Sequence, residues 1–247
     1  MTDAGPDLRG RGPEGQWPRF DCPDGALPEG SHPEAGRAGS AVERAVVRGA
    51  VLCGGRSRRM GTDKALLVGA EGRTLLERAL RTVEAVGARA AIACGASERY
   101  HDHLTPEREL RLDDAPAGAG PLGGLVTVLE DTPDHGWTVT LPVDMVGVSA
   151  ELLQRLLEHA QRAEADLCLA SGPRGLEPLL GAFGPACAPL ARRLLAAGER
   201  RPIALADRRH GLKAVELRLA PDEAARALCN LNHPTDWERV ALRAEVS

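Results

Sequence analysis

Aromatic residues and lysine are scarce in this sequence. Phe, Trp and Tyr supply only 2% of its 247 residues, so Ala, Leu and Val must form most of the apolar core, which favours helices packed on a Val- and Leu-rich sheet. The basic residues number 31, yet the lysines are confined to Lys64 and Lys213. A lysine inside a motif is therefore more informative here than one of the many arginines.

Patterns typical of several other protein classes are also missing. The net charge of −4 argues against a general nucleic-acid binder, because such proteins carry a basic face. The six cysteines form no CxxC pair and no Cys/His group at zinc spacing, which predicts reduced thiols. No apolar run approaches the roughly 18 residues needed to span a membrane, and the N-terminus lacks a signal-peptide core. We therefore expect a cytoplasmic protein with neither nucleic acid nor a membrane as its partner.

Glycine and proline are concentrated at the N-terminus. Residues 1–40 contain eight glycines and six prolines, a share above the roughly 25–30% that is typical of disordered segments. We expect residues 1–45 to form a disordered tail and residues 46–247 to form a single domain.

Strand-like and helix-like segments alternate from about residue 46. The predicted strands of the first half are residues 45–53, 88–94, 110–114 and 136–144, and the helices are residues 74–87, 121–131 and 149–163. The order is looser in the second half, where we predict strands at residues 166–171, 177–183 and 213–218 and helices at residues 189–198 and 234–246. Such alternation predicts an α/β fold, doubly wound, with a mostly parallel sheet covered by helices on both faces.

A loop rich in glycine and positive charge follows the first predicted strand. Gly54 and Gly55 allow the backbone to approach a ligand while their N–H groups point at an anion. Four cations lie within nine residues: Arg56, Arg58, Arg59 and Lys64. This density suits a triphosphate and its leaving pyrophosphate, although the spacing is neither that of a Walker A loop nor that of a dinucleotide fingerprint. The alternative is a solvated turn with exposed arginines.

Asp144 stands at the end of the strongest predicted strand. A carboxylate there either caps the next helix or binds Mg²⁺, which takes one or two carboxylates together with substrate phosphates. Ser149 already offers an N-cap for that helix, so the pattern favours the metal ligand.

Two weaker motifs carry polar residues beside predicted helices. Asp113 and Asp114 precede a glycine-rich stretch and either begin a turn or, in the case of Asp114, contact a ribose or base. Asn230 and Asn232 precede Pro234, where Asn commonly serves as a turn or N-cap residue.

Taken together, these stretches resemble the molybdenum cofactor guanylyltransferase (MobA) family. Its hallmark LAGGxSxRMGxDK appears as LCGGRSRRMGTDK, its GPLxG as GPLGGL, its PxD strand end as PVDM and its closing NxNTPE as NLNHPTDWE. The motifs occur in the family's order and span about residues 46–243. The departures are Cys53 in place of Ala and HPTD in place of a TPED-like helix start.

The resemblance implies a Rossmann-like nucleotidyltransferase with GTP, molybdopterin and proteins that deliver molybdopterin as its partners. Leu52, Cys53, Gly54, Gly55, Lys64 and Asp114 would bind the nucleotide. Asp144 would bind both the nucleotide and Mg²⁺, and Arg59, Lys64 and Asp144 would be the catalytic residues. Asn230 and Asn232 would lie on the acceptor side.

By the same resemblance, the enzyme would transfer GMP from GTP to molybdopterin and release pyrophosphate. Related cytidylyltransferases open with LAAG and close with NxDTPED, so Gly54-Gly55 and Asn232 favour GTP over CTP. Two alternatives remain open. One is a cytidylyl- or other nucleotidyltransferase with a different phosphorylated acceptor, and the other is a non-catalytic GTP-binding module.

Overall fold

The computed structural model describes residues 46–53, 63–69, 72–87, 89–93, 100, 108–111, 119–133 and 135–229. The predicted N-terminal tail and the predicted closing helix at residues 234–246 lie outside these ranges and stay predictions.

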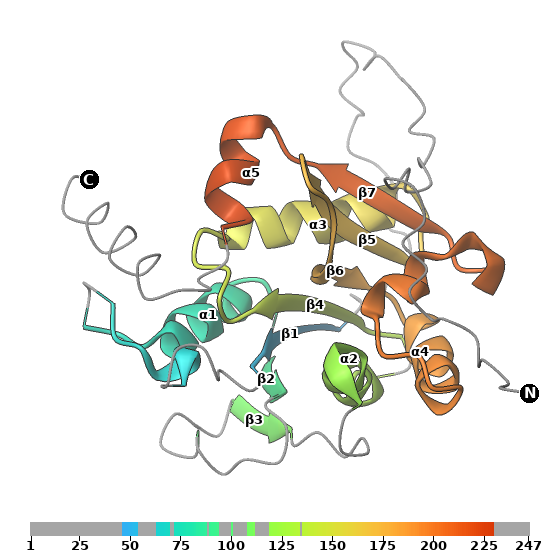
Figure 1. Ribbon diagram of the computed structural model, residues 1–247, viewed down its shortest axis with the longest axis horizontal. Coiled ribbons are helices and arrows are strands. Elements are labelled where there is room, and N and C mark those ends of the chain that lie inside the picture. The colour runs from blue at the N-terminus through green and yellow to red at the C-terminus, as the bar shows by residue number, and fades with distance from the viewer. Residues whose placement is uncertain are drawn as a thin grey trace, which may run out of the picture. The chain divides into compact units, whose positions relative to one another are not determined.

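The described residues form one mixed β-sheet (Figure 1). Its seven described strands lie in the order β3-β2-β1-β4-β6-β5-β7. The strands are β1 (Val47–Leu52), β2 (Arg89–Ala93), β3 (Arg108–Arg111), β4 (Trp137–Pro142), β5 (Leu167–Gly172), β6 (Gly175–Phe183) and β7 (Ala214–Arg218). Neighbours pair in parallel except at β6, which runs antiparallel to both β4 and β5. The predicted mostly parallel α/β sheet is confirmed.

Helices cover both faces of this sheet. The α-helices are α1 (Leu75–Glu84), α2 (Gly120–Glu130), α3 (Ala150–Arg162), α4 (Cys187–Ala196) and α5 (Pro221–Ala227), and the short 3₁₀ helices are η1 (Lys64–Leu66), η3 (Pro202–Ala206) and η4 (Arg208–His210). Helices α1 and α3 pack against one face, and α2 and α4 pack together against the other. None of the described helices has the length and apolarity that a membrane crossing requires.

Local sequence explains where the longer helices begin. Thr74 and Glu77 form a reciprocal capping box at the start of α1, which satisfies two backbone N–H groups that would otherwise lack partners. Ser149 caps α3 as predicted, since its Oγ accepts a hydrogen bond from the Leu152 N–H at 3.2 Å. Four leucines of α3 recur at helical spacing and are buried against the sheet: Leu152, Leu153, Leu156 and Leu157.

The second half of the chain differs in detail from the prediction. β6 begins at Gly175, two residues before the predicted strand, because a tight hairpin links it to β5. Helix α5 was not predicted. Its signals are Pro221 at the first helical position and acidic residues in the first turn, which favour a helix N-terminus, but its length of seven residues gives too little periodicity to detect.

A buried ion pair joins the sheet to α2. Arg48 lies within β1 and is 6% exposed, and its Nη1 forms an ion pair with Asp131 Oδ2 at the C-terminal end of α2. A buried guanidinium is tolerated only when a carboxylate neutralises it. This pair therefore links strand β1 to the end of helix α2.

Replacement of Asp131 by Ala should destabilise the fold strongly. Loss of one partner from a buried ion pair typically costs about 3–5 kcal/mol, because the remaining charge is left uncompensated. Urea unfolding measures this change in the free energy of unfolding. The matched control is Glu158→Ala, which breaks an exposed pair with Arg162 on α3 and should cost about 0.3–0.5 kcal/mol. Equal losses in the two variants would contradict the structural role of the Arg48–Asp131 pair.

Candidate active site

The carboxyl ends of β1, β2 and β4 meet at one edge of the sheet. Leu52, the last residue of β1, is in register with Ala93 of β2 and Pro142 of β4. The Cys53 N–H donates to the Ala93 carbonyl at 2.7 Å, and the Val143 N–H donates to the Leu52 carbonyl at 3.1 Å. The structure thus places two predicted nucleotide contacts, Leu52 and Cys53, at the edge where open α/β sheets bind ligands.

Lys64 is the first residue of the 3₁₀ helix η1, and the residues around it fix this helix in place. Asp63 is its N-cap, with Oδ1 accepting a hydrogen bond from the Ala65 N–H at 3.1 Å. Ala65 itself is buried in the core. The capped turn therefore fixes the backbone position from which the Lys64 side chain extends.

Asp144 lies in the turn that follows β4, and it faces Lys64. The distance from Asp144 Oδ2 to Lys64 Nζ is 3.7 Å, and the two side chains are 26% and 18% exposed, respectively. Because Ser149 caps α3, the Asp144 carboxylate is not used as a helix cap. The structure therefore brings two of the three predicted catalytic residues together in one partly buried site.

A second carboxylate, Glu177 of β6, lies within electrostatic range of Asp144. Burial raises the pKa of the Asp144 carboxyl above its ordinary value of 3.8, and the charge of Lys64 opposes this rise. Burial likewise raises the pKa of Glu177, where Arg174 opposes the rise and the negative charge of Asp144 adds to it. A cation bound beside these groups would favour the ionised form of each carboxyl and so lower its pKa.

The hairpin between β5 and β6 positions Glu177 and Arg174. Neither residue is among the site residues predicted from the sequence. The register between these strands shifts at Leu169/Ala170, and Ala170 pairs with Glu177 beyond the shift. Such irregularities redirect side chains and are frequent beside active sites. The only signal in the sequence is an acidic residue at the head of the otherwise apolar predicted strand 177–183.

The chain that precedes Asn230 comes to the same part of the molecule. Arg174 Nη2 donates to the Leu228 carbonyl at 2.8 Å. The turn after β4 also packs tightly on α5, since a Cβ on Gly147 would lie 1.9 Å from the Arg226 carbonyl oxygen. The end of α5 is thereby fixed to both the Asp144 turn and the β5–β6 hairpin.

The other predicted site residues fall outside the described part of the chain, and their assignments stay predictions. They are Gly54, Gly55, Arg59, Asp114, Asn230 and Asn232.

Asp144 has the chemistry of a magnesium ligand. In the ranges that the structure describes, no three His, Cys, Asp or Glu side chains are grouped as a metal site. Mg²⁺ does not require such a group, because it commonly takes one or two carboxylates and completes its shell with phosphate oxygens and water. The partly exposed carboxylate of Asp144 fits that type of site.

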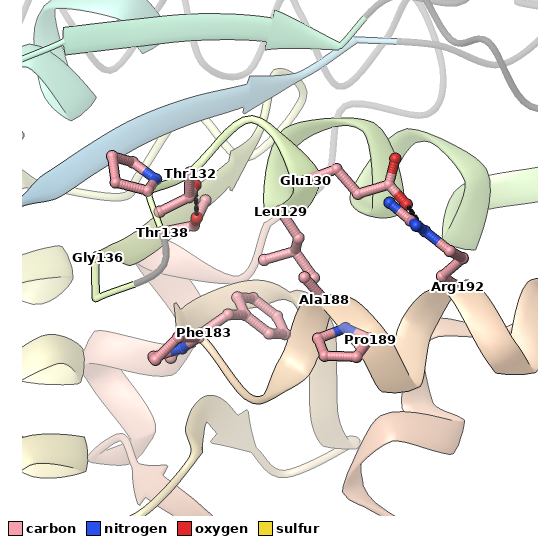
Figure 2. A pocket seen from close by; sticks show the side chains of 12 residues that line it. Leu129, Glu130, Thr132, Gly136, Thr138, Phe183, Ala188, Pro189 and Arg192 are labelled. Atoms are coloured by element: carbon pink, nitrogen blue, oxygen red, sulfur yellow. Dashed lines mark hydrogen bonds and ion pairs between the residues drawn. The ribbon is translucent and has the colours of Figure 1, made fainter.

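A cavity of about 260 Å³ lies at the other end of the sheet, near the start of β4 (Figure 2). Leu129, Phe183 and Pro189 give it apolar walls, and Glu130 and Arg192 form an ion pair along its lining. It shares no residue with the edge that holds Lys64 and Asp144, so we do not assign the active site to it.

Comparison with known proteins identifies the family. Residues 49–213 match the MobA-like NTP transferase domain. A Xanthomonas euvesicatoria protein named "Molybdenum cofactor guanylyltransferase" is 33% identical over 198 residues, which cover 78% of this chain and 93% of that protein. A Synechococcus elongatus protein named "Probable molybdenum cofactor guanylyltransferase" is 32% identical over 195 residues, covering 78% and 96% of the two chains.

Solved structures show the same fold. The molybdopterin-guanine dinucleotide biosynthesis protein A from Archaeoglobus fulgidus superposes with a TM-score of 0.66 at 22% identity, covering 81% of this chain and all of that one. The predicted nucleotidyltransferase fold is thus confirmed. The chain belongs to the MobA-like NTP transferase family and is a nucleotidyltransferase.

Proposed function

We propose that this enzyme transfers GMP from GTP to molybdopterin, forming molybdopterin guanine dinucleotide and pyrophosphate. The observation that carries the proposal is the distance of 3.7 Å between Lys64 Nζ and Asp144 Oδ2. It joins a cation suited to a leaving pyrophosphate with a carboxylate suited to a metal, at the carboxyl edge of the sheet. The names of the relatives support the choice of nucleotide and acceptor.

The proposed reaction needs no nucleophile from the protein. An oxygen of the terminal phosphate of molybdopterin forms a bond to the α-phosphorus of GTP. The bond from that phosphorus to the oxygen bridging to the β-phosphate breaks, and pyrophosphate leaves with the electron pair. Positioning and charge neutralisation carry most of the catalysis in phosphoryl transfers of this kind.

The residues of the site then have separate roles. Lys64, with Arg59 from the glycine loop, stabilises the charge that gathers on the β- and γ-phosphates as pyrophosphate leaves. Gly54, Gly55 and Asp114 hold the nucleotide, and Asn230 and Asn232 face the acceptor. Asp144 would hold Mg²⁺, which when bound supplies further charge neutralisation at the phosphate oxygens.

The location of Glu177 suits the acceptor side of this arrangement. It extends from the hairpin whose Arg174 anchors the chain just before Asn230. An acceptor bound there would lie near Asp144, and in this proposal it attacks the α-phosphorus from the side opposite the leaving pyrophosphate. In-line displacement requires the attacking and leaving oxygens to lie on opposite sides of the phosphorus.

The choice of nucleotide can be tested by incubating the enzyme with molybdopterin, Mg²⁺ and each of the four nucleoside triphosphates in turn. We expect dinucleotide and pyrophosphate to form in equal amounts with GTP only. Product from CTP would instead support the cytidylyltransferase alternative. Tight GTP binding without pyrophosphate release would support a binding module.

Asp144→Asn should nearly abolish turnover while preserving the fold, because it removes the negative charge but little volume. Loss of one group that stabilises developing charge costs about 10²–10³ in rate, and pyrophosphate release measures it. Glu158→Gln, the same change of carboxylate to amide on α3, is the matched control and should leave the rate unchanged. A normal rate for Asp144→Asn at saturating Mg²⁺ would refute the role of Asp144.

Lys64→Met should lower turnover and also shift its pH dependence. The positive charge of Lys64 opposes the rise of the Asp144 pKa, so its removal raises that pKa further. If the Asp144 carboxylate must be ionised, the acid limb of kcat/KM, which reports the free enzyme, moves to higher pH in the variant. An acid limb at an unchanged or lower pH would show that the two groups do not interact in solution.

A further inference from the structure

The position of Lys64 depends on a helix that is too short to be stable by itself. Helix η1 contains three residues, and an isolated turn of this length does not repay the entropy of its formation. The Leu66 N–H donates to the Asp63 carbonyl and the Leu67 N–H donates to the Lys64 carbonyl, each at 3.1 Å. The stability of the turn must therefore come from its contacts with the rest of the protein.

Asp63 links this helix to another part of the chain, since its two carboxylate oxygens have different partners. Oδ1 accepts the hydrogen bond from the Ala65 N–H that caps η1. Oδ2 accepts a hydrogen bond of 2.8 Å from the hydroxyl of Tyr100. The capping carboxylate is thus held from the opposite side by a residue 37 positions later in the chain.

Tyr100 is well suited to fix this carboxylate. It belongs to the connection between β2 and β3 and is only 2% exposed, with its ring packed in the apolar core. A tyrosine side chain has few rotatable bonds, so packing of the ring fixes the direction of the hydroxyl. A hydrogen bond from a hydroxyl to a carboxylate is also stronger than one between neutral groups.

We propose that Tyr100 and Asp63 are positioning residues that hold Lys64 at the correct distance from Asp144 and from the leaving phosphates. The inference rests on the proposed function, in which Lys64 stabilises the departing pyrophosphate. Tyr100 holds the Asp63 carboxylate, and Asp63 caps the single turn of η1. This turn fixes the backbone of Lys64, from which the lysine side chain extends. Neither residue touches the substrate.

A residue that only stabilises the fold would have different consequences. Its loss would lower the stability of the protein, and any change in turnover would be the same whether or not Lys64 is present. A positioning residue acts only through the group that it positions. Its effect on the rate therefore disappears when that group is removed, which a double-mutant cycle detects.

The test compares the Tyr100→Phe, Lys64→Met and double variants of the full-length enzyme. Turnover is measured by transfer of label from α-³²P-GTP to molybdopterin, so that low rates remain measurable, and thermal unfolding is followed in parallel. Tyr100→Phe removes only the hydroxyl. We expect it to lower kcat on the order of tenfold, because small displacements of a catalytic group are costly, and to lower it less than twofold in the Lys64→Met background.

Thr132→Val is the matched control for the loss of a partly buried hydroxyl. The Thr132 hydroxyl hydrogen bonds to that of Thr138, beside the cavity at the far end of the sheet. Its loss should lower the thermal stability by a similar amount and leave kcat unchanged. A fall in kcat for this variant would mean that lost stability explains the effect of Tyr100→Phe, and the inference would be overturned.

The remaining outcomes separate this inference from the proposed function. Equal rate losses from Tyr100→Phe in both backgrounds, or no loss when Lys64 is present, would overturn the positioning role while leaving the role of Lys64 intact. A normal rate for Lys64→Met would instead refute the proposed role of Lys64, and the positioning role would fall with it.

Discussion

The arrangement of the site depends on one electrostatic contact, the approach of the Lys64 ammonium to the Asp144 carboxylate. These groups come from segments far apart in the chain, and both are largely removed from water. Their attraction is stronger there than in bulk solvent, yet burial still raises the pKa of Asp144. Attraction to Lys64 therefore offsets only part of the cost of burying the Asp144 carboxylate.

The antiparallel strand β6 completes this edge of the sheet. By pairing with both β4 and β5, it carries Glu177 toward the turn that holds Asp144, and Arg174 lies in the hairpin turn just before it. The hairpin is also tied to the end of α5 through Leu228. The described edge of the sheet thus combines the ends of β1 and β4 from the first half of the chain with the β5–β6 hairpin from the second half.

Stability and chemistry are divided between the two ends of the sheet. The Arg48–Asp131 ion pair joins β1 to the end of α2, and the cavity of Figure 2 lies at the same end. The Arg48–Asp131 ion pair stabilises the packing of α2 on β1. At the carboxyl ends of β1 and β4, by contrast, burial raises the pKa values of Asp144 and Glu177, a pattern that is frequent at functional sites.

The sequence by itself determined the α/β class, the helices α1 to α3 and the N-cap at Ser149, and it singled out Lys64 and Asp144 as candidate site residues. These features follow from local sequence patterns: the spacing of apolar residues, helix-capping residues, a glycine-rich loop and a carboxylate at a strand end. Only the tertiary structure decided that β6 would run antiparallel between β4 and β5, that Glu177 would approach Asp144, and that Tyr100 would hold Asp63. Such contacts join residues distant in the chain, and their formation depends on strand order and register, which spacing along the sequence does not encode.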